Sequence, residues 1–156
     1  MTTPFRPRLA AALLLPLAVA AAPVLAAGTD SGASTAPATQ SGFAEAKAAA
    51  DAGRYPEALK LLAAVIKAEP RNADALNLMG YSNRKMNRMA EAARWYDAAL
   101  KANPKHLGAL EYQGEMFVDT GDYTSARANL NRLATLCGKC DEYNDLRAAL
   151  MAAGQG

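Results

Sequence analysis

The fold is decided by residues 73–106, which read ADALNLMGYSNRKMNRMAEAARWYDAALKANPKH. Small, apolar and polar residues recur there at spacings of three and four, at Leu76, Met79, Gly80 and Asn83 and then at Ala92, Tyr96, Ala99 and Leu100. Residues at these spacings share one face of a helix. Asn87-Arg88 separates the two runs. The segment therefore predicts two helices joined by a tight turn.

The same pattern returns after 34 residues on both sides of this segment. The matching positions are Ala58, Ala92 and Ala126; Leu62, Tyr96 and Leu130; Val65, Ala99 and Leu133; Leu76 and Leu110; Gly80 and Gly114; and Pro70 and Pro104. A fixed period of this length is typical of stacked helical repeats, in which each unit buries its apolar face against the next. We therefore expect three units, at residues 42–72, 73–106 and 107–136.

Glycines mark two kinds of position in these units. Gly80 and Gly114 are expected where the two helices of a unit approach closely, because a larger side chain would push the helices apart. Their expected neighbours across the unit are Ala92 and Ala126. Residues that tolerate the positive φ of a helix C-terminus follow the first helix of each unit, at Gly53, Asn87 and Gly121.

The pattern resembles tandem tetratricopeptide repeats, and the resemblance is carried by Leu76, Gly80, Ala92, Tyr96, Ala99 and Pro104 with their equivalents in the neighbouring units. It implies an all-α solenoid of about three helix pairs. The apolar end of such a stack needs a cap, which we assign to residues 137–153. There Asp141 suits a helix N-cap, and Tyr143, Leu146 and Leu150 form an inward stripe.

The resemblance also implies a concave groove, lined by the first helix of each pair, that binds an extended peptide or a partner helix. On this chain the implied groove residues are Asn77, Tyr81, Arg84, Lys85, Glu111, Glu115, Val118 and Asp119. One wall would be positive and the next negative, with an apolar anchor near Tyr81 and Val118. The family variant that clamps a C-terminal carboxylate is not expected, since Phe43, Tyr81 and Glu115 depart from its pattern.

The only cysteines, Cys137 and Cys140, lie at the bend before the capping helix. A disulfide that pins this bend, a redox-active pair and a metal site all remain open, although a metal site would need further ligands and the chain offers only His106. The tail from Leu136 to Leu146 resembles the ending of small secreted bacterial repeat proteins, which favours the disulfide. No metal or cofactor is expected.

The beginning of the chain predicts export. Residues 1–26 combine Arg6 and Arg8 with a long apolar run and small residues at its end, as in a cleaved secretory signal peptide. A retained membrane helix is the alternative. Residues 27–41 are expected to be a disordered leader, because Gly, Ser, Thr, Ala, Pro and Gln bury little apolar surface. The expected location is the periplasm or the medium.

Charge and composition narrow the function. Without Arg6 and Arg8, the chain has 15 basic and 15 acidic residues, so nucleic acid is not an expected partner. No catalytic constellation surrounds His106, which we interpret as an exposed turn residue. We expect a non-enzymatic scaffold or assembly adaptor of the bacterial cell envelope that binds a protein or peptide. A thiol-dependent redox protein is the alternative, and self-association is left open because three repeats are few for an independent stack.

Overall fold

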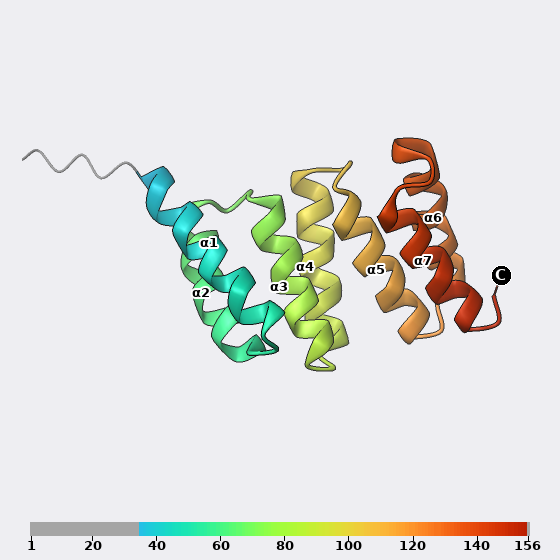
Figure 1. Ribbon diagram of the computed structural model, residues 1–156, viewed down its shortest axis with the longest axis horizontal. Helices are drawn as coiled ribbons and strands as arrows, with labels where there is room; N and C mark the ends of the chain where they lie inside the picture. Colours follow the sequence, from blue (N-terminus) through green and yellow to red (C-terminus); the bar gives the residue numbers. More distant parts are fainter. Residues whose placement is uncertain (1–34, 156) are drawn as a thin grey trace, which may run out of the picture. The chain divides into compact units, whose positions relative to one another are not determined.

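The computed structural model describes residues 35–155, which form helices and turns without a β-strand (Figure 1). The helices are α1 (Thr35–Asp51), α2 (Tyr55–Ala68), α3 (Ala73–Lys85), α4 (Met89–Ala102), α5 (Leu107–Asp119), α6 (Tyr123–Cys137) and α7 (Asp141–Ala152). The predicted all-α fold of three helix pairs and a terminal helix is confirmed. The expected signal peptide lies outside the described residues. None of the described helices has the length and apolar composition needed to cross a membrane.

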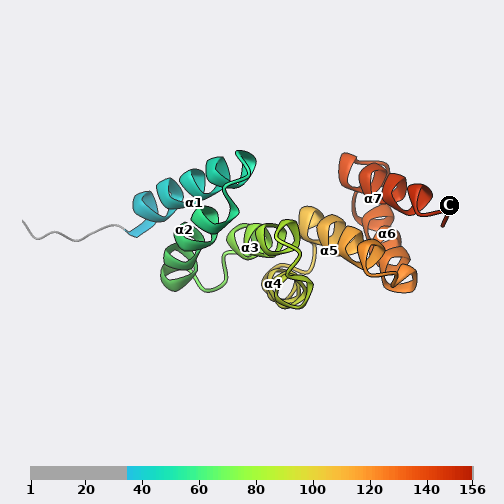
Figure 2. The same ribbon diagram turned by 90° about the horizontal axis from the view of Figure 1, so that it is seen from below.

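The helices are arranged on two sides of the stack. Consecutive helices pack as the pairs α1/α2, α3/α4 and α5/α6, and α7 packs against both α5 and α6. The helices α1, α3, α5 and α7 each contact the next in that series, whereas α2, α4 and α6 do not contact one another within residues 35–155. Helices on the inside of a curve lie closer together than those outside. We therefore call the side formed by α1, α3, α5 and α7 the inner face (Figure 2).

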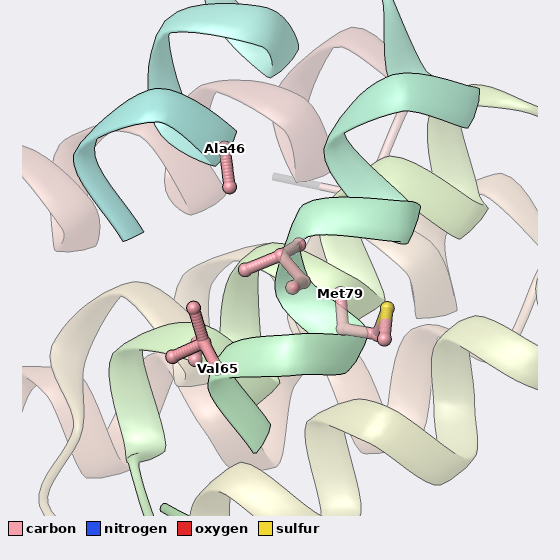
Figure 3. Close-up of a cluster of buried hydrophobic side chains, with 5 residues drawn as sticks. Ala46, Val65 and Met79 are labelled. Atoms are coloured by element: carbon pink, nitrogen blue, oxygen red, sulfur yellow. The ribbon is translucent and has the colours of Figure 1, made fainter. Parts of the chain in front are cut away.

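The core runs through the junctions between repeats. Ala46 of α1, Val65 of α2 and Met79 of α3 belong to one buried cluster with Leu62 and Ala75 (Figure 3). Ala46 and Leu62 are fully buried, so α1 approaches α2 through a small side chain. Burial of a large aliphatic side chain stabilises a fold by about 1.5–3 kcal/mol. The buried side chains at each junction between repeats contribute this stabilisation.

Gly80 and Gly114 each lie against a large side chain of a neighbouring helix. A Cβ on Gly80 would lie 2.6 Å from ring atoms of Tyr96 on α4, so the close approach predicted within this unit is correct and its tightest contact is with Tyr96. A Cβ on Gly114 would overlap Leu146 on α7. The tightest contact at Gly114 is therefore with the capping helix, which the sequence pattern did not indicate.

The turns follow the predicted chemistry. Gly53 and Gly121 have φ values of 73° and 80°, and among residues 35–155 Asn87 is the one non-glycine residue with positive φ, at 60°. Asparagine tolerates this left-handed conformation better than other side chains with a Cβ. Each first helix of a pair therefore ends where the sequence indicated.

His106 is not the exposed turn residue that we expected. Its Nδ1 accepts a hydrogen bond from the backbone N–H of Ala109 at 3.1 Å, which caps α5. Its Nε2 lies 3.0 Å from Oδ1 of Asp74 in α3, and its side chain is only 12% exposed. The residue therefore joins the starts of α3 and α5, a contact between repeats that no local pattern reveals.

The predicted leader is shorter than expected. Helix α1 begins at Thr35, inside the segment 27–41 that we expected to be disordered. Thr39 is buried and donates a hydrogen bond to Glu69 at 2.5 Å. Phe43 packs on the cluster that contains Val65. Contacts with the second helix of the unit thus order residues whose composition alone favours disorder, and the earlier residues of the expected leader lie outside the described part.

Candidate functional site

Three tyrosines form a row across the inner face. The ring centroid of Tyr81 on α3 lies 6.2 Å from that of Tyr55 on α2 and 5.1 Å from that of Tyr112 on α5. The first pair is edge-on and the second is tilted by 45°. The ammonium of Lys85 lies 5.9 Å from the centroid of Tyr81, within reach of a cation–π contact. Burial raises the pKa of Tyr81, and it raises that of Tyr112 to about 12, so both hydroxyls remain protonated donors at neutral pH.

A pocket of about 200 Å³ lies beside this row. It is lined from α1, α3 and α5 by Phe43, Lys47, Asp51, Asp74, Asn77, Leu78, Tyr81 and Tyr112. Drug-sized ligands usually occupy larger cavities, so this space fits one side chain or a short stretch of peptide. Its walls combine aromatic rings with a few polar atoms, the composition of a surface that selects a partner.

Asn77 is the polar side chain of this pocket that lacks a partner. Its Oδ1 is buried without a hydrogen bond among the described residues. A buried acceptor without a donor costs about 1–3 kcal/mol, so the atom is a candidate for a donor from a bound molecule. Asparagine carries both a donor and an acceptor, which suits recognition of a peptide backbone.

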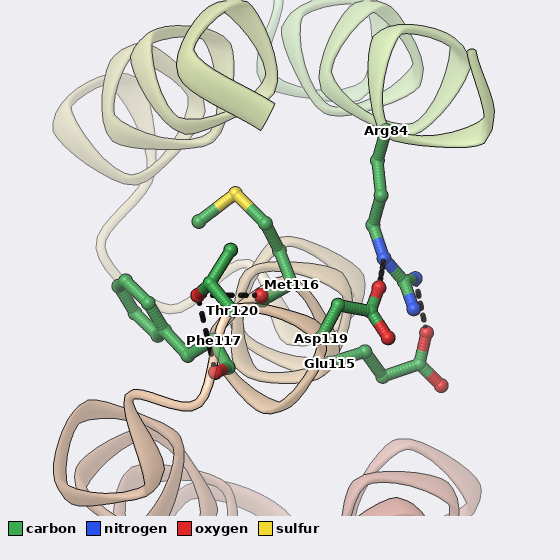
Figure 4. Close-up of polar contacts among 6 residues, drawn as sticks. All are labelled: Arg84, Glu115, Met116, Phe117, Asp119 and Thr120. Atoms are coloured by element: carbon green, nitrogen blue, oxygen red, sulfur yellow. Dashed lines mark hydrogen bonds and ion pairs between the residues drawn. The ribbon is translucent and has the colours of Figure 1, made fainter. Parts of the chain in front are cut away.

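Arg84 connects the second and third repeats across the inner face. Its Nη1 lies 2.5 Å from Oε2 of Glu115, and its Nε lies 2.7 Å from Oδ2 of Asp119 (Figure 4). The Arg84 side chain is 15% exposed and the two carboxylates accept from one planar guanidinium. Arg84 of the expected positive wall is therefore paired with Glu115 and Asp119 of the expected negative wall. The three residues form a brace between α3 and α5.

Glu111 is the buried carboxylate of the inner face. It is 7% exposed and forms no hydrogen bond or ion pair with any residue of the described chain. Burial, together with the neighbouring charges of Glu115, Asp145 and Glu142 and against the opposing charge of Arg84, raises its pKa to about 8. The carboxyl group thus lies where acidic residues of α5 and α7 converge. We call Glu111, Glu115, Glu142 and Asp145 the acidic cluster.

The remaining predicted groove residues play different parts. Lys85 is exposed and lies over Tyr81. Val118 packs on the buried cluster of Leu110, Leu133 and Leu146 between α5, α6 and α7. It therefore belongs to the core rather than to the surface near Tyr81. The structure brings Asn77, Tyr81, Arg84, Glu115 and Asp119 onto one continuous side of α3 and α5.

The predicted groove did not include Tyr55, Tyr112, Phe43 or Lys47. The 34-residue repeat period could have identified two of them, Phe43 and Lys47. Shifting Asn77 by 34 residues leads to Phe43 in one direction and Glu111 in the other, and the same shift relates Lys47 to Tyr81 and Glu115. Tyr112 is the equivalent of Leu78. Tyr55 comes from a second helix, and only the tertiary contact places it on this side.

The cysteine pair lies away from the pocket, between α6 and α7. The sulfur atoms of Cys137 and Cys140 are 2.06 Å apart, within bonding distance, and the Cα atoms are 5.7 Å apart. A carboxylate oxygen of Glu142 lies within 4.8 Å of both sulfurs.

Stacked helix pairs with a pocket on the inner face define a helical-repeat protein. The sequence profile described as "Tetratricopeptide repeat" matches residues 43–106 and 79–139. These matches together span more than half of the chain, and the protein belongs to the tetratricopeptide repeat family. No curated protein sequence matches the chain.

Solved structures share the fold at low sequence identity. The first repeat domain of Spaghetti (RPAP3) bound to the HSP90 peptide SRMEEVD is 18% identical, with a TM-score of 0.66, and the alignment covers 74% of this chain and 93% of that one. The Sgt2 domain from Aspergillus fumigatus is 21% identical, with a TM-score of 0.67 and coverage of 76% and 78%. The Yersinia enterocolitica secretion chaperone SycD, in complex with a peptide of the translocator YopD, is 16% identical, with a TM-score of 0.66 and coverage of 76% and 93%.

Proposed function

We propose that this protein is a scaffold or assembly adaptor that holds an extended segment of a partner protein on its inner face, without a catalytic step of its own. The pocket between α1, α3 and α5 carries the proposal. Three repeats contribute to it, so a bound segment would lie across the stack. Tyr81 and Tyr112 supply apolar surface, and the unpaired Oδ1 of Asn77 would accept a hydrogen bond from the segment.

Two of the similar structures support a peptide as the ligand. One holds an HSP90 peptide and another holds a peptide of a translocator. The present chain offers a different set of side chains, since the equivalent positions of its three repeats are Phe43, Asn77 and Glu111. We therefore propose the mode of binding, an extended segment across the first helices, and not the ligand of either relative.

The proposed location is the bacterial cell envelope. The apolar run after Arg6 and Arg8 supports export, and disulfides persist in oxidising compartments, where a bond between Cys137 and Cys140 would hold α7 in place. Mass spectrometry of the protein from its host tests both points. Export predicts a mature N-terminus at Ala27 or Gly28 and a mass lower by two hydrogens than that of the dithiol chain.

Site-specific crosslinking tests the inner face directly. A photoreactive phenylalanine analogue in place of Tyr81 is expected to crosslink a partner segment that mass spectrometry can sequence. The same analogue at Tyr123, at the start of α6, is the matched control. Asn77→Ala should reduce the yield at position 81. Equal crosslinking from positions 81 and 123, or a yield unaffected by Asn77→Ala, would contradict the proposed function.

A further inference from the structure

We propose that the acidic cluster binds a lysine or arginine side chain of the segment held on the inner face. This inference rests on the proposed function and adds the chemistry of the ligand. The cluster lies where α5 meets the capping helix α7, beyond the pocket of the tyrosine row. A basic side chain would lie among Glu111, Glu115, Glu142 and Asp145, with its backbone across α3 and α5.

Glu111 is the residue whose surroundings indicate a ligand, because it is buried and has no partner among the described residues. It is more than nine-tenths buried, and no N–H or O–H group of the described residues donates to it. A buried carboxylate is costly unless it is paired and hydrogen-bonded. An ammonium or guanidinium group would supply both the charge and the donors, and such charge-assisted bonds are about twice as strong as neutral ones.

The surrounding charges leave this place negative. Glu115 is on the same helix as Glu111, and the charges of Asp145 and Glu142 on α7 help to raise the pKa of Glu111. Arg84 of α3, whose charge opposes the rise in the pKa of Glu111, is already engaged by Glu115 and Asp119.

The other two helices packed against α5, which are α4 and α6, make polar contacts with Gln113 and Leu110 of α5. Asp97 of α4 accepts a hydrogen bond from Gln113. Asn129 of α6 donates to Gln113 and to the carbonyl of Leu110. Complementarity therefore favours a positively charged ligand.

The acidic cluster is continuous with the pocket. Tyr112 lines the pocket, and its hydroxyl is close enough to Glu111, Glu115 and Asp145 for these charges to help raise its pKa. Its ring is also a surface on which a cation can rest. Asn77 and Glu111 occupy equivalent places in successive repeats, and each has an acceptor without a donor. One extended segment could therefore supply donors to both.

The spacing of the carboxylates favours a side chain over a metal ion. Calcium and magnesium require several oxygen ligands that converge within a few ångströms. Within residues 35–155, the one group of three or more such ligands whose atoms lie within 4.8 Å of one another is Cys137, Cys140 and Glu142. Glu111, Glu115 and Asp145 are more widely spaced, as suits a guanidinium or an ammonium on a long stem.

Selection from random peptides displayed on phage tests the inference. The wild-type protein is expected to enrich peptides with lysine or arginine at one position relative to an aromatic or apolar residue. Glu111→Gln should weaken the binding of a selected peptide about tenfold or more, because it removes one partner of a buried charge pair. Glu111→Lys should enrich aspartate and glutamate at that position instead. Glu91→Gln, an exposed change on α4, is the matched control and should leave binding unchanged.

Measuring proton release on binding distinguishes a direct contact between the ligand and Glu111 from an indirect effect of Glu111 on the structure. A cation beside Glu111 stabilises its charged form, so binding should release a proton from this carboxyl at neutral pH, where it is mainly protonated. Affinity should then rise as the pH approaches about 8, and the binding enthalpy should depend on the ionisation enthalpy of the buffer. Glu111→Gln should abolish both effects while the circular dichroism spectrum is unchanged.

The outcomes distinguish this inference from the proposed function. Peptides that bind wild type but are insensitive to Tyr81→Ala, or the absence of any selected peptide, would contradict the proposed function and the inference together. Peptides that require Tyr81 but show no enrichment of lysine or arginine, or that bind Glu111→Gln as tightly as wild type, would overturn the inference alone. Calcium binding that Glu111→Gln abolishes would overturn it as well, because the cluster would then be a metal site.

Discussion

Gly80 lies directly against the ring of Tyr96, and a Cβ at this glycine would be 2.6 Å from two of the ring atoms. Tyr96 is fully buried, so its ring has little room to move. The contact joins α3 to α4 within the second repeat. It also lies beneath the inner face, since Arg84 and Glu115 are among the charged groups that act on the Tyr96 hydroxyl.

Gly80→Ala is therefore expected to destabilise the protein by about 1–3 kcal/mol, even though alanine is the better helix former. The added methyl group forces either the ring or the helix to shift. Urea unfolding measures the change. Gly42→Ala is the control, because its Cβ would lie 3.3 Å from a single methyl group of Val65, and its effect should be much smaller. Equal midpoints for Gly80→Ala and wild type would contradict the tight contact.

Arg84→Ala is expected to lower the free energy of unfolding by about 1–3 kcal/mol, because it leaves the carboxylate of Glu115 without its partner at a partly buried site. The control is Arg54→Ala, which breaks an ion pair with Glu57 whose side chains are 57% and 54% exposed. That change should cost well under 1 kcal/mol, at about the level of other surface pairs. Thermal unfolding of both variants at low and high salt measures the two losses of stability. A cost for Arg84→Ala no larger than that for Arg54→Ala would refute the brace.

The raised pKa of Glu111 predicts a pH dependence of stability. Between its ordinary value of 4.5 and its value in the fold of about 8, the folded chain holds a proton that the unfolded chain has lost. The contribution of Glu111 to the free energy of unfolding therefore falls as the pH rises through this window, by at most about 1.4 kcal/mol per pH unit. Glu111→Gln should remove this slope and stabilise the protein near pH 8. Parallel stability curves for wild type and Glu111→Gln would disprove the shift.

Replacing both cysteines by alanine tests the role of the Cys137–Cys140 pair. The chain-entropy model gives about 2 kcal/mol for so short a loop, so a moderate fall in melting temperature is expected under oxidising conditions. Wild type treated with a reductant should show the same fall. Crosslinking of a partner segment from position 81 should be nearly unchanged, because neither cysteine lines the pocket between α1, α3 and α5. Loss of function with full retention of stability would favour the thiol-dependent redox alternative.

Local signals in the chain were sufficient for the helices and their turns. The spacing of Leu76 and Gly80 on α3, and that of Ala92 and Tyr96 on α4, reflects helix periodicity, which depends on residues three and four apart. Positive φ at Gly53, Asn87 and Gly121 followed from the conformational freedom of glycine and asparagine. The repeat period also indicates which helix faces are equivalent, and the groove predicted from it includes Asn77 and Tyr81 of the residues that line the pocket.

Contacts between repeats could not be predicted from helix periodicity and turn residues. His106 bonds with Asp74, Thr39 with Glu69 and Gly114 packs under Leu146, and each pair joins residues about one repeat apart. The charges of Arg84, Glu115 and Asp119 were visible in the sequence as two opposite walls. Whether they face a ligand or one another depends on the distance between α3 and α5, which is set by packing.

The sequence by itself determined that this protein is a stack of helix pairs, because a pattern repeated every 34 residues can bury its apolar faces only against its own copies. Only the tertiary structure decided which side chains of the inner face are already satisfied. Arg84 is paired, whereas Glu111 and Asn77 keep acceptors without donors. The reason is that hydrogen bonds and ion pairs act over a few ångströms, and those distances arise when separate helices pack together.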